Sequence, residues 1–338
     1  MEKVLIIGPD FSSINDSVAD AFSALGYETL VYDFCENYPV KAMTKVTHGL
    51  LPKLGIKRFL VGYDDTVNQE ISDIFRSFKP DIVLVIKGHK IYRETLEKMK
   101  SAKLLLWMMD SVNRVQATLD NIDLFDFVFV FNEDDVDILA SKGIESFPLP
   151  LALDRNRYSP VNVTNKDIDI IFIGALYPER IAILKQIIQT YPEKRILVCG
   201  PFTCWRHNLR NVGLRFGKNR RIFRVGTISS KDANLLYARS KIVLNIHNDF
   251  SLSGCNLRFF EIAGTRSIQI VNRKQIIMDE YNMEALLFDQ YDDIVQIIDN
   301  IDKGVIDANR LSSDVFEITV NRHTFLERVK TIIDIASG

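Results

Sequence analysis

Short apolar runs alternate with longer amphipathic stretches along the whole chain. The runs are rich in Val, Ile, Leu and Phe, which is typical of strands that are buried on both faces of a sheet. They predict strands at residues 4–7, 29–32, 82–86, 104–107 and 127–131, and again at 168–173, 195–199, 222–225, 242–246 and 267–270. The amphipathic stretches predict helices at residues 19–25, 71–78, 136–142, 179–189, 232–239, 256–263 and 294–301. This alternation indicates an α/β fold with parallel sheets covered by helices.

The alternation is interrupted between residues 148 and 166. Prolines stand at 148, 150 and 160, and residues 161–166 are polar without periodicity, so we expect a linker here. The two series of elements predict two Rossmann-like domains, at residues 1–155 and 166–315. Because ligands of such sheets bind beyond the carboxyl ends of the strands, the residues that directly follow the predicted strands are candidates for a site.

Small and polar residues follow four strands of the second domain. They are Gly174, Tyr177 and Arg180 after the first strand, Gly200 after the second, Gly226 and Thr227 after the third, and His247 after the fourth. Glycine lets a phosphate approach the backbone closely, and a histidine can donate to a phosphate or a sugar hydroxyl. The alternative for each glycine is an ordinary turn that needs glycine for its backbone conformation, and the alternative for the histidine is a structural role as a buried hydrogen-bonding group. Because the loops after the four strands meet at one edge of the sheet, these residues together predict that a nucleotide binds at that edge.

The segment SGCNLRFFEIAG (residues 253–264) follows the strand at 242–246 and opens a helix. A helix N-terminus presents free backbone N–H groups and attracts anions. Arg258 and Glu261 are three residues apart and share one helix face. The arginine can pair with a phosphate, and the glutamate can accept hydrogen bonds from sugar hydroxyls. The alternative is an ordinary solvated ion pair on the helix surface.

The first domain offers two candidates for a catalytic base. His89 and Asp110 each come soon after an apolar strand, at 82–86 and at 104–107. A base of this kind would take the proton of an acceptor hydroxyl. Asp110 can equally be the N-cap of a helix that begins at Ser111. For Asp10, in the loop after the first strand, a cap or turn role is favoured over catalysis.

Composition excludes several classes of function. The net charge of −2 gives no global basic field for nucleic acid or anionic membrane. The chain has no G-x-G-x-x-G and no Walker A lysine loop, which argues against a dinucleotide oxidoreductase and a P-loop kinase. The four cysteines have no zinc-module spacing, and no strand-end loop has a D-x-D pattern, so we expect no metal and no cofactor. No signal-like segment or membrane-length apolar run is present, which predicts a cytoplasmic protein.

The stretch NLRFFEIAG (256–264) resembles the donor-site signature of glycosyltransferases related to the spore maturation protein CgeB. Three further segments resemble motifs of that family in the same order: LLWMMDS (105–111), DIIFIGALYPER (169–180) and RHTFLER (322–328). The resemblance implies a GT-B arrangement, with the acceptor side in the first domain and the donor site in the second. It implies that Asn256, Leu257, Arg258 and Glu261 bind the donor, and that residues 316–338 form a C-terminal helix that packs back on the first domain.

Two positions depart from the related retaining transferases of the family 4 type. Ser253 stands where those enzymes have a second glutamate, and Ala175 stands where they have an arginine directly after the glycine that matches Gly174. The retaining mechanism is therefore not transferred to this chain, and the stereochemistry stays open.

Together these observations predict a hexosyltransferase-type glycosyltransferase. It would move a sugar from a nucleotide-diphosphate donor to a hydroxyl of a glycan, a protein or a small molecule. Arg258 and Arg180 would offset the charge of the leaving diphosphate in place of a metal. A nucleotide-sugar epimerase on the same scaffold and a non-catalytic nucleotide-sugar-binding protein are the alternatives.

Overall fold

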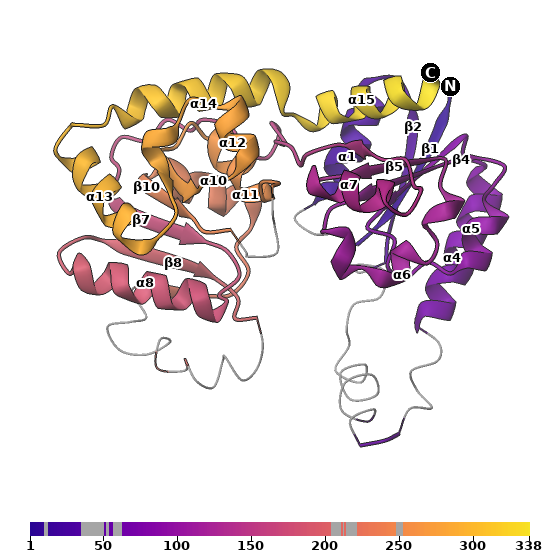
Figure 1. Cartoon of the computed structure of the whole chain (residues 1–338), viewed down its shortest axis with the longest axis horizontal. Coiled ribbons are helices and arrows are strands. Elements are labelled where there is room, and N and C mark those ends of the chain that lie inside the picture. Colours follow the sequence, from indigo (N-terminus) through magenta and orange to yellow (C-terminus); the bar gives the residue numbers. More distant parts are fainter. Residues whose placement is uncertain are drawn as a thin grey trace. The chain divides into compact units, whose positions relative to one another are not determined.

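The computed structural model describes residues 1–9, 13–34, 51, 54–56, 63–203, 211, 213, 222–247 and 253–338. The chain divides into two compact units (Figure 1). Unit 1 contains Met1–Pro150 and Phe325–Gly338, and unit 2 contains Leu151–Thr324. The C-terminal segment that belongs to unit 1 thus begins at Phe325 and not at residue 316, because residues up to Arg322 form a helix of unit 2.

Unit 1 is built on a parallel six-stranded sheet within the described residues, in the order β2-β1-β3-β4-β5-β6. Its strands are β1 (Lys3–Gly8), β2 (Glu28–Asp33), β3 (Ile82–Ile86), β4 (Lys103–Met108), β5 (Phe127–Val130) and β6 (Phe147–Pro148). Its helices are α1 (Ile14–Ala24), α4 (Tyr63–Phe78), α5 (Arg93–Lys98), η2 (Val112–Arg114), α6 (Gln116–Leu119), η3 (Ile122–Leu124), α7 (Asp134–Ala140) and α15 (Phe325–Ser337).

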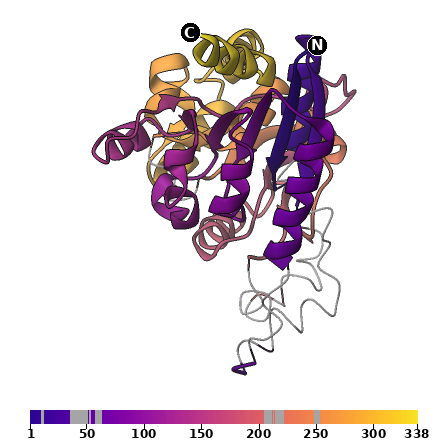
Figure 2. The same ribbon diagram turned by 90° about the vertical axis from the view of Figure 1, so that its right-hand side faces the viewer.

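Alternate residues of the unit 1 strands are buried on opposite faces, as the continuous apolar runs predict. Leu5 and Ile7 of β1 join a core cluster that includes Val67 and Ile71 of α4. The other face is covered where α1 packs against α15 (Figures 1 and 2). The C-terminal helix is held there by a hydrogen bond from Arg328 Nε to the Pro150 carbonyl oxygen, at 2.8 Å.

Unit 2 contains a second parallel sheet, which has six strands in the described part and the order β12-β11-β10-β7-β8-β9. Its strands are β7 (Ile168–Ile173), β8 (Ile196–Gly200), β9 (Phe223–Val225), β10 (Ser240–Asn245), β11 (Gln269–Asn272) and β12 (Leu287–Phe288). Its helices are α8 (Pro178–Thr190), α10 (Ser230–Ala238), α11 (Leu257–Gly264), α12 (Gln275–Glu280), η6 (Glu284–Leu286), α13 (Tyr291–Asp302) and α14 (Ala308–Arg322). The chain order reverses between the neighbours β7 and β10, which is the switch point where such sheets bind ligands.

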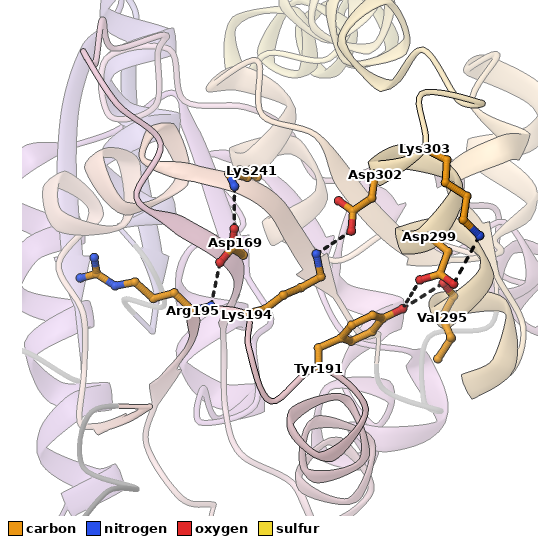
Figure 3. Close-up of polar contacts among 9 residues, drawn as sticks. All are labelled: Asp169, Tyr191, Lys194, Arg195, Lys241, Val295, Asp299, Asp302 and Lys303. Carbon is orange, nitrogen blue, oxygen red and sulfur yellow. Dashed lines mark hydrogen bonds and ion pairs between the residues drawn. The ribbon is translucent and has the colours of Figure 1, made fainter.

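The amino-terminal edge of the unit 2 sheet carries charged residues that pair with one another (Figure 3). Asp169 accepts from the Arg195 backbone N–H and pairs with Lys241 at 2.7 Å. The Tyr191 hydroxyl donates to Asp299 of α13 at 2.9 Å. These contacts link α13 to the segment before β8, and the charges at this edge are paired with one another.

The predicted fold class is confirmed by the two parallel sheets with covering helices. No helix in the described part of the chain is both long and apolar enough to cross a membrane.

Candidate functional site

The loops after β7, β8 and β9 are joined by backbone hydrogen bonds at the carboxyl edge of the unit 2 sheet. The N–H of Gly174 donates to Cys199 at 2.9 Å, and the N–H of Gly226 donates to Gly200 at 3.2 Å. Thr227 follows at an exposed position. The predicted glycines therefore do lie side by side along one edge.

Gly200 has a structural reason to be glycine. Its φ is 148°, and a Cβ built on it would lie 1.8 Å from the Gly174 carbonyl oxygen. Only glycine allows the ends of β7 and β8 to approach this closely. The close approach explains Gly200 without any contact to a ligand, so its predicted binding role stays a prediction.

The turn from β10 into α11 is held by a network of asparagine side chains. Asn256 is the N-cap of α11, and its side chain accepts from the Phe259 N–H at 3.0 Å. Asn256 and Asn245 exchange two side-chain hydrogen bonds of 3.2 and 2.9 Å. The N-cap satisfies one of the free N–H groups of the helix. Leu257, the first residue of α11, is half-buried.

His247 lies against this N-cap and is 5% exposed. The backbone N–H of Asn256 donates to its Nε2 at 3.1 Å. Burial, together with the nearby cations Lys274 and Arg180, lowers the pKa of His247 to about 3, and the Asn272 side chain acts against that shift. The ring is therefore neutral at pH 7, and because Nε2 accepts, its proton is on Nδ1. Nδ1 has no hydrogen-bond partner among the described residues, so a buried donor remains available to a ligand.

Two cations lie close to His247. Arg180, in the first turn of α8, is 8% exposed and donates to the Ala175 carbonyl oxygen at 3.0 Å. Its guanidinium carbon lies 5.3 Å from the ring centre of Tyr177, the N-cap of α8. A cation in the first turn of a helix opposes the helix dipole, which favours anions there. An anion bound between the cations would offset this cost.

Lys274 is the second cation, and sequence reasoning missed it. It is the N-cap residue of α12 and follows β11, the strand next to β10. Its position after a predicted strand could have marked Lys274 as a candidate site residue. Its proximity to His247 could be inferred only from the order of the strands in the sheet. We call the residues that follow β7, β10 and β11 at this edge the switch-point edge.

Arg258 and Glu261 form a largely buried ion pair and not a solvated one. Arg258 Nη1 lies 2.6 Å from Glu261 Oε2, and the side chains are 28% and 2% exposed, respectively. Arg258 Nη1 also lies 3.4 Å from the hydroxyl of Tyr158. Burial raises the pKa of Glu261, and the Arg258 charge and the Tyr158 hydroxyl act against that shift. Tyr158 was not among the predicted residues.

In unit 1, Asp110 is an ion-pair partner. It forms a short contact with Lys87, which follows β3, and it lies 3.2 Å from Arg114 Nη1. The N-cap residue of the following 3-10 helix is Ser111, and no side-chain hydrogen bond caps that helix. The alternative role as a helix cap is therefore not seen for Asp110.

His89 is close enough to Lys87 and Asp110 for their charges to act on its ring, in opposite directions. It is half-buried, and its ring packs edge-on against Phe34 with the centres 5.5 Å apart. Burial lowers the pKa of His89 to about 4, with a further contribution from Lys87 and Lys90. The imidazole is neutral at pH 7, and its Nδ1 has no hydrogen-bond partner among the described residues.

A buried carboxylate, Asp135, holds the loop that follows Asp110. Its side chain is fully buried and accepts from the Ser111 hydroxyl at 3.0 Å, from the Val112 N–H at 3.4 Å and from the Asn132 amide at 3.2 Å. Burial raises its pKa, and these hydrogen bonds oppose the shift. Asp135 thus ties the loops after β4 and β5 together, a role that no local sequence pattern indicated.

Within the part of the chain that the structure describes, no group of three His, Cys, Asp or Glu side chains could hold a metal. Cys199 and Cys255 are buried and unbridged. Metal independence stays a prediction. Asp10, whose loop was considered above, lies outside the described residues.

Residues 180–334 match a family model described as glycosyl transferase-like. The broader family of the predicted resemblance is thereby supported for the C-terminal half, whereas the CgeB-like subfamily stays a prediction. No curated protein matches the chain by sequence.

Solved structures match the whole chain. Sucrose-phosphate synthase from Thermosynechococcus elongatus has a TM-score of 0.71 at 10% identity, covering 99% of this chain and 98% of that one. Alr3699/HepE from Anabaena, in complex with UDP-glucose, has a TM-score of 0.67 at 12% identity, covering 100% of both chains. A lipopolysaccharide outer core galactosyltransferase, WaaB, has a TM-score of 0.61 at 14% identity, covering 99% of both chains. The chain therefore has the GT-B fold.

Proposed function

We propose that this protein is a glycosyltransferase whose nucleotide-diphosphate sugar binds at the switch-point edge of unit 2. The observation that supports this most directly is the buried Nδ1–H of His247, an unsatisfied donor beside the N-terminus of α11. Arg180 and Lys274 lie close enough to lower the pKa of that imidazole. A diphosphate has oxygens that can accept a hydrogen bond from His247 and negative charge that can pair with Arg180 and Lys274. The family match at residues 180–334 covers these residues.

The donor is a UDP-hexose in this proposal, since a neighbour of the same fold binds UDP-glucose. When the glycosidic bond to the diphosphate breaks, negative charge grows on the leaving phosphate. Arg180, Lys274 and Arg258 would stabilise that charge together with the dipole of α11, which is the task that a divalent metal performs in other enzymes. Activity is accordingly expected to survive EDTA.

The acceptor hydroxyl must lose a proton, and unit 1 supplies two groups that could take it. The two carboxylate oxygens of Asp110 face Lys87 and Arg114, so that side chain is already engaged as an ion-pair partner. His89 is neutral at pH 7 and has a ring nitrogen without a partner among the described residues. We therefore favour His89 as the base and Asp110 as the group that orders the surrounding cations. The acceptor would be a hydroxyl of a glycan, a protein or a small molecule, and the enzyme would act in the cytoplasm as a CgeB-like member of its family.

A thermal-shift scan tests the proposal. The purified chain would be heated with UDP, GDP and ADP and with their hexose conjugates, and each stabilising sugar nucleotide would then be incubated with candidate acceptors and followed by mass spectrometry. Stabilisation by a nucleotide sugar and formation of a glycosylated product are expected. Conversion of the donor into its epimer without transfer would favour an epimerase. Stabilisation without any turnover would favour a binding protein, and no stabilisation by any nucleotide would contradict the donor site.

A further inference from the structure

A cavity of about 130 Å³ lies in unit 1, on the face of the sheet that α1 and α15 cover. It is at the amino-terminal edge of the sheet, because its lining includes Glu2 just before β1, Asp81 just before β3, and Lys103 at the start of β4. His89 and Asp110 follow the carboxyl ends of β3 and β4, so the cavity is at the opposite edge from these candidate acceptor-side residues. Both ends of the chain lie at this end of unit 1 (Figures 1 and 2).

The inner wall of the cavity is apolar. Phe22 of α1, Leu105 of β4 and Ile332 of α15 line it, and each of these residues has an exposed fraction of 0%. An apolar cavity of roughly 150 Å³ stays dry and is large enough to hold a benzene ring. This cavity therefore fits one small apolar group, such as a six-membered ring or a short branched chain.

The lining carries more negative than positive charge. Glu2 and Asp81 contribute two carboxylates, and Lys103 contributes the one ammonium group among the lining residues. The Lys103 ammonium donates to the carbonyl oxygen of Ala336, near the end of α15. The negative end of the helix dipole lies there, and the last turn of α15 contains no basic residue. The cation of the lining is thus used by the helix end, whereas the two carboxylates face no cation of the lining.

Both carboxylates have neutral hydrogen-bond donors beside them. Asp81 Oδ2 accepts from the backbone N–H of Lys3 at 2.8 Å. Burial and the charge of Glu2 raise the pKa of the nearby Tyr27 phenol. Neither neighbour brings a positive charge to the carboxylate, and an ionised carboxylate can accept about four hydrogen bonds. Each carboxylate can therefore also accept from a cationic ligand.

We propose that this cavity is a separate ligand site, which binds a small organic amine. The apolar group of the amine fills the space between Phe22, Leu105 and Ile332, and its ammonium group pairs with Glu2 and Asp81. Charge selects the ligand, because an anion of the same shape would meet two carboxylates and the negative end of α15. The bound amine also packs under the last turns of α15 and holds them against the sheet. The site shares no residue with the switch-point edge and does not depend on the proposed function.

Calorimetry at pH 7 with benzylamine, benzyl alcohol and benzoate tests this proposal, since the three probes share one ring and differ in charge. Benzylamine is expected to bind about 10-fold more tightly than benzyl alcohol, through two partly exposed ion pairs and the helix end. Benzoate is expected to bind more weakly than both. Absence of benzylamine binding, equal affinities of the three probes, or a preference for benzoate would each overturn the proposal.

Variants show whether the amine binds in this cavity. Glu2→Gln and Asp81→Asn should each weaken benzylamine about 3-fold and leave benzyl alcohol unchanged, because each removes one exposed partner of the ammonium group. Glu94→Gln is the matched control, since it removes an exposed carboxylate of α5 outside the lining. An equal loss in Glu94→Gln would mean that only net charge matters, and would overturn the proposal. No loss in either cavity variant would overturn it as well.

Ile333→Phe places a larger side chain in the lining and should weaken benzylamine and benzyl alcohol alike, by about 10-fold or more. Unchanged affinities in a folded Ile333→Phe protein would place the ligand elsewhere. If this variant does not fold, the two charge variants decide, because both change exposed positions.

Hydrogen exchange locates the bound amine independently of affinity. Benzylamine should protect residues 332–337 of α15, benzoate should not, and neither should protect residues 174–180 or 253–261 of unit 2. Protection by benzylamine of the unit 2 segments in place of residues 332–337 would overturn the proposal.

Discussion

The backbone N–H of Asn256 donates to Nε2 of His247 at 3.1 Å, and this one hydrogen bond sets the tautomer of a buried imidazole. With Nε2 engaged as acceptor, the neutral ring carries its proton on Nδ1 and presents a donor at the start of α11. Asn256, the N-cap of α11, thus also determines which nitrogen of His247 carries the proton that we assign to donor binding.

We expect His247→Gln to weaken UDP by about 10-fold, because the glutamine oxygen can still accept from Asn256 while the Nδ1–H is lost. Isothermal titration calorimetry measures this change. His323→Gln is the control, since it replaces another buried histidine of unit 2, one that faces Glu280 at 3.4 Å. Unchanged UDP affinity in His247→Gln, or an equal loss in both variants, would remove His247 from the site.

The same residue predicts a pH dependence of stability. Folding lowers the pKa of His247 from its ordinary value of 6.5 to about 3, so between these values the unfolded chain binds more protons than the folded one. The contribution of His247 to stability is complete above pH 6.5 and is lost as the pH falls toward 3. Urea unfolding from pH 7.5 to 4 should therefore show a steeper loss in wild type than in His247→Gln. Parallel curves would contradict the lowered pKa.

Two glycines of the unit 2 edge predict a contrast in stability. Gly200→Ala should destabilise by about 3 kcal/mol or more, because the new Cβ would meet the Gly174 carbonyl oxygen and the backbone must move. Gly226 has a similar φ of 152°, but a Cβ there meets nothing within 4 Å. Gly226→Ala should cost only the backbone strain, about 1–3 kcal/mol. Chemical denaturation compares the two, and a cost for Gly226→Ala that equals or exceeds that for Gly200→Ala would refute the packing explanation.

The strands were predictable where burial on both faces produced an unbroken apolar run. β6 and β12 were missed because each has two residues and gives no periodic signal. Helix α14 was missed for a different reason. Its buried positions are Ala308, Ser312, Val315 and Thr319, so small and polar side chains stand where an apolar stripe would normally reveal a helix.

The candidate site was predictable only in part. Arg180, His247 and Arg258 could be found because each stands beside a strand end or in a recognisable motif. Lys274 and Tyr158 belong to other segments of the chain, and their positions depend on which strands are neighbours and which segment packs on α11. Burial of Glu261 is likewise a property of packing, which a spacing of three residues on a helix cannot reveal.

The proposed division of roles in unit 1 predicts unequal effects on catalysis. His89→Gln should lower transfer by about 100-fold or more with unchanged UDP affinity, as expected for loss of a general base. Asp110→Asn should lower transfer less, since in this account it orders Lys87 and Arg114. Steady-state kinetics with the same donor and acceptor compare the variants. Normal transfer by His89→Gln together with an inactive Asp110→Asn would reverse the assignment.

Hydrogen exchange with and without UDP-glucose tests the donor site most directly. We predict protection of residues 174–180 and 253–261, which contain the first turns of α8 and α11, and no change at residues 191–195, on the opposite edge of the same sheet. Absence of protection at the first two segments, or protection confined to the strand ends of unit 1 near Gly8 and Ile86, would contradict a nucleotide-sugar site at the switch-point edge of unit 2.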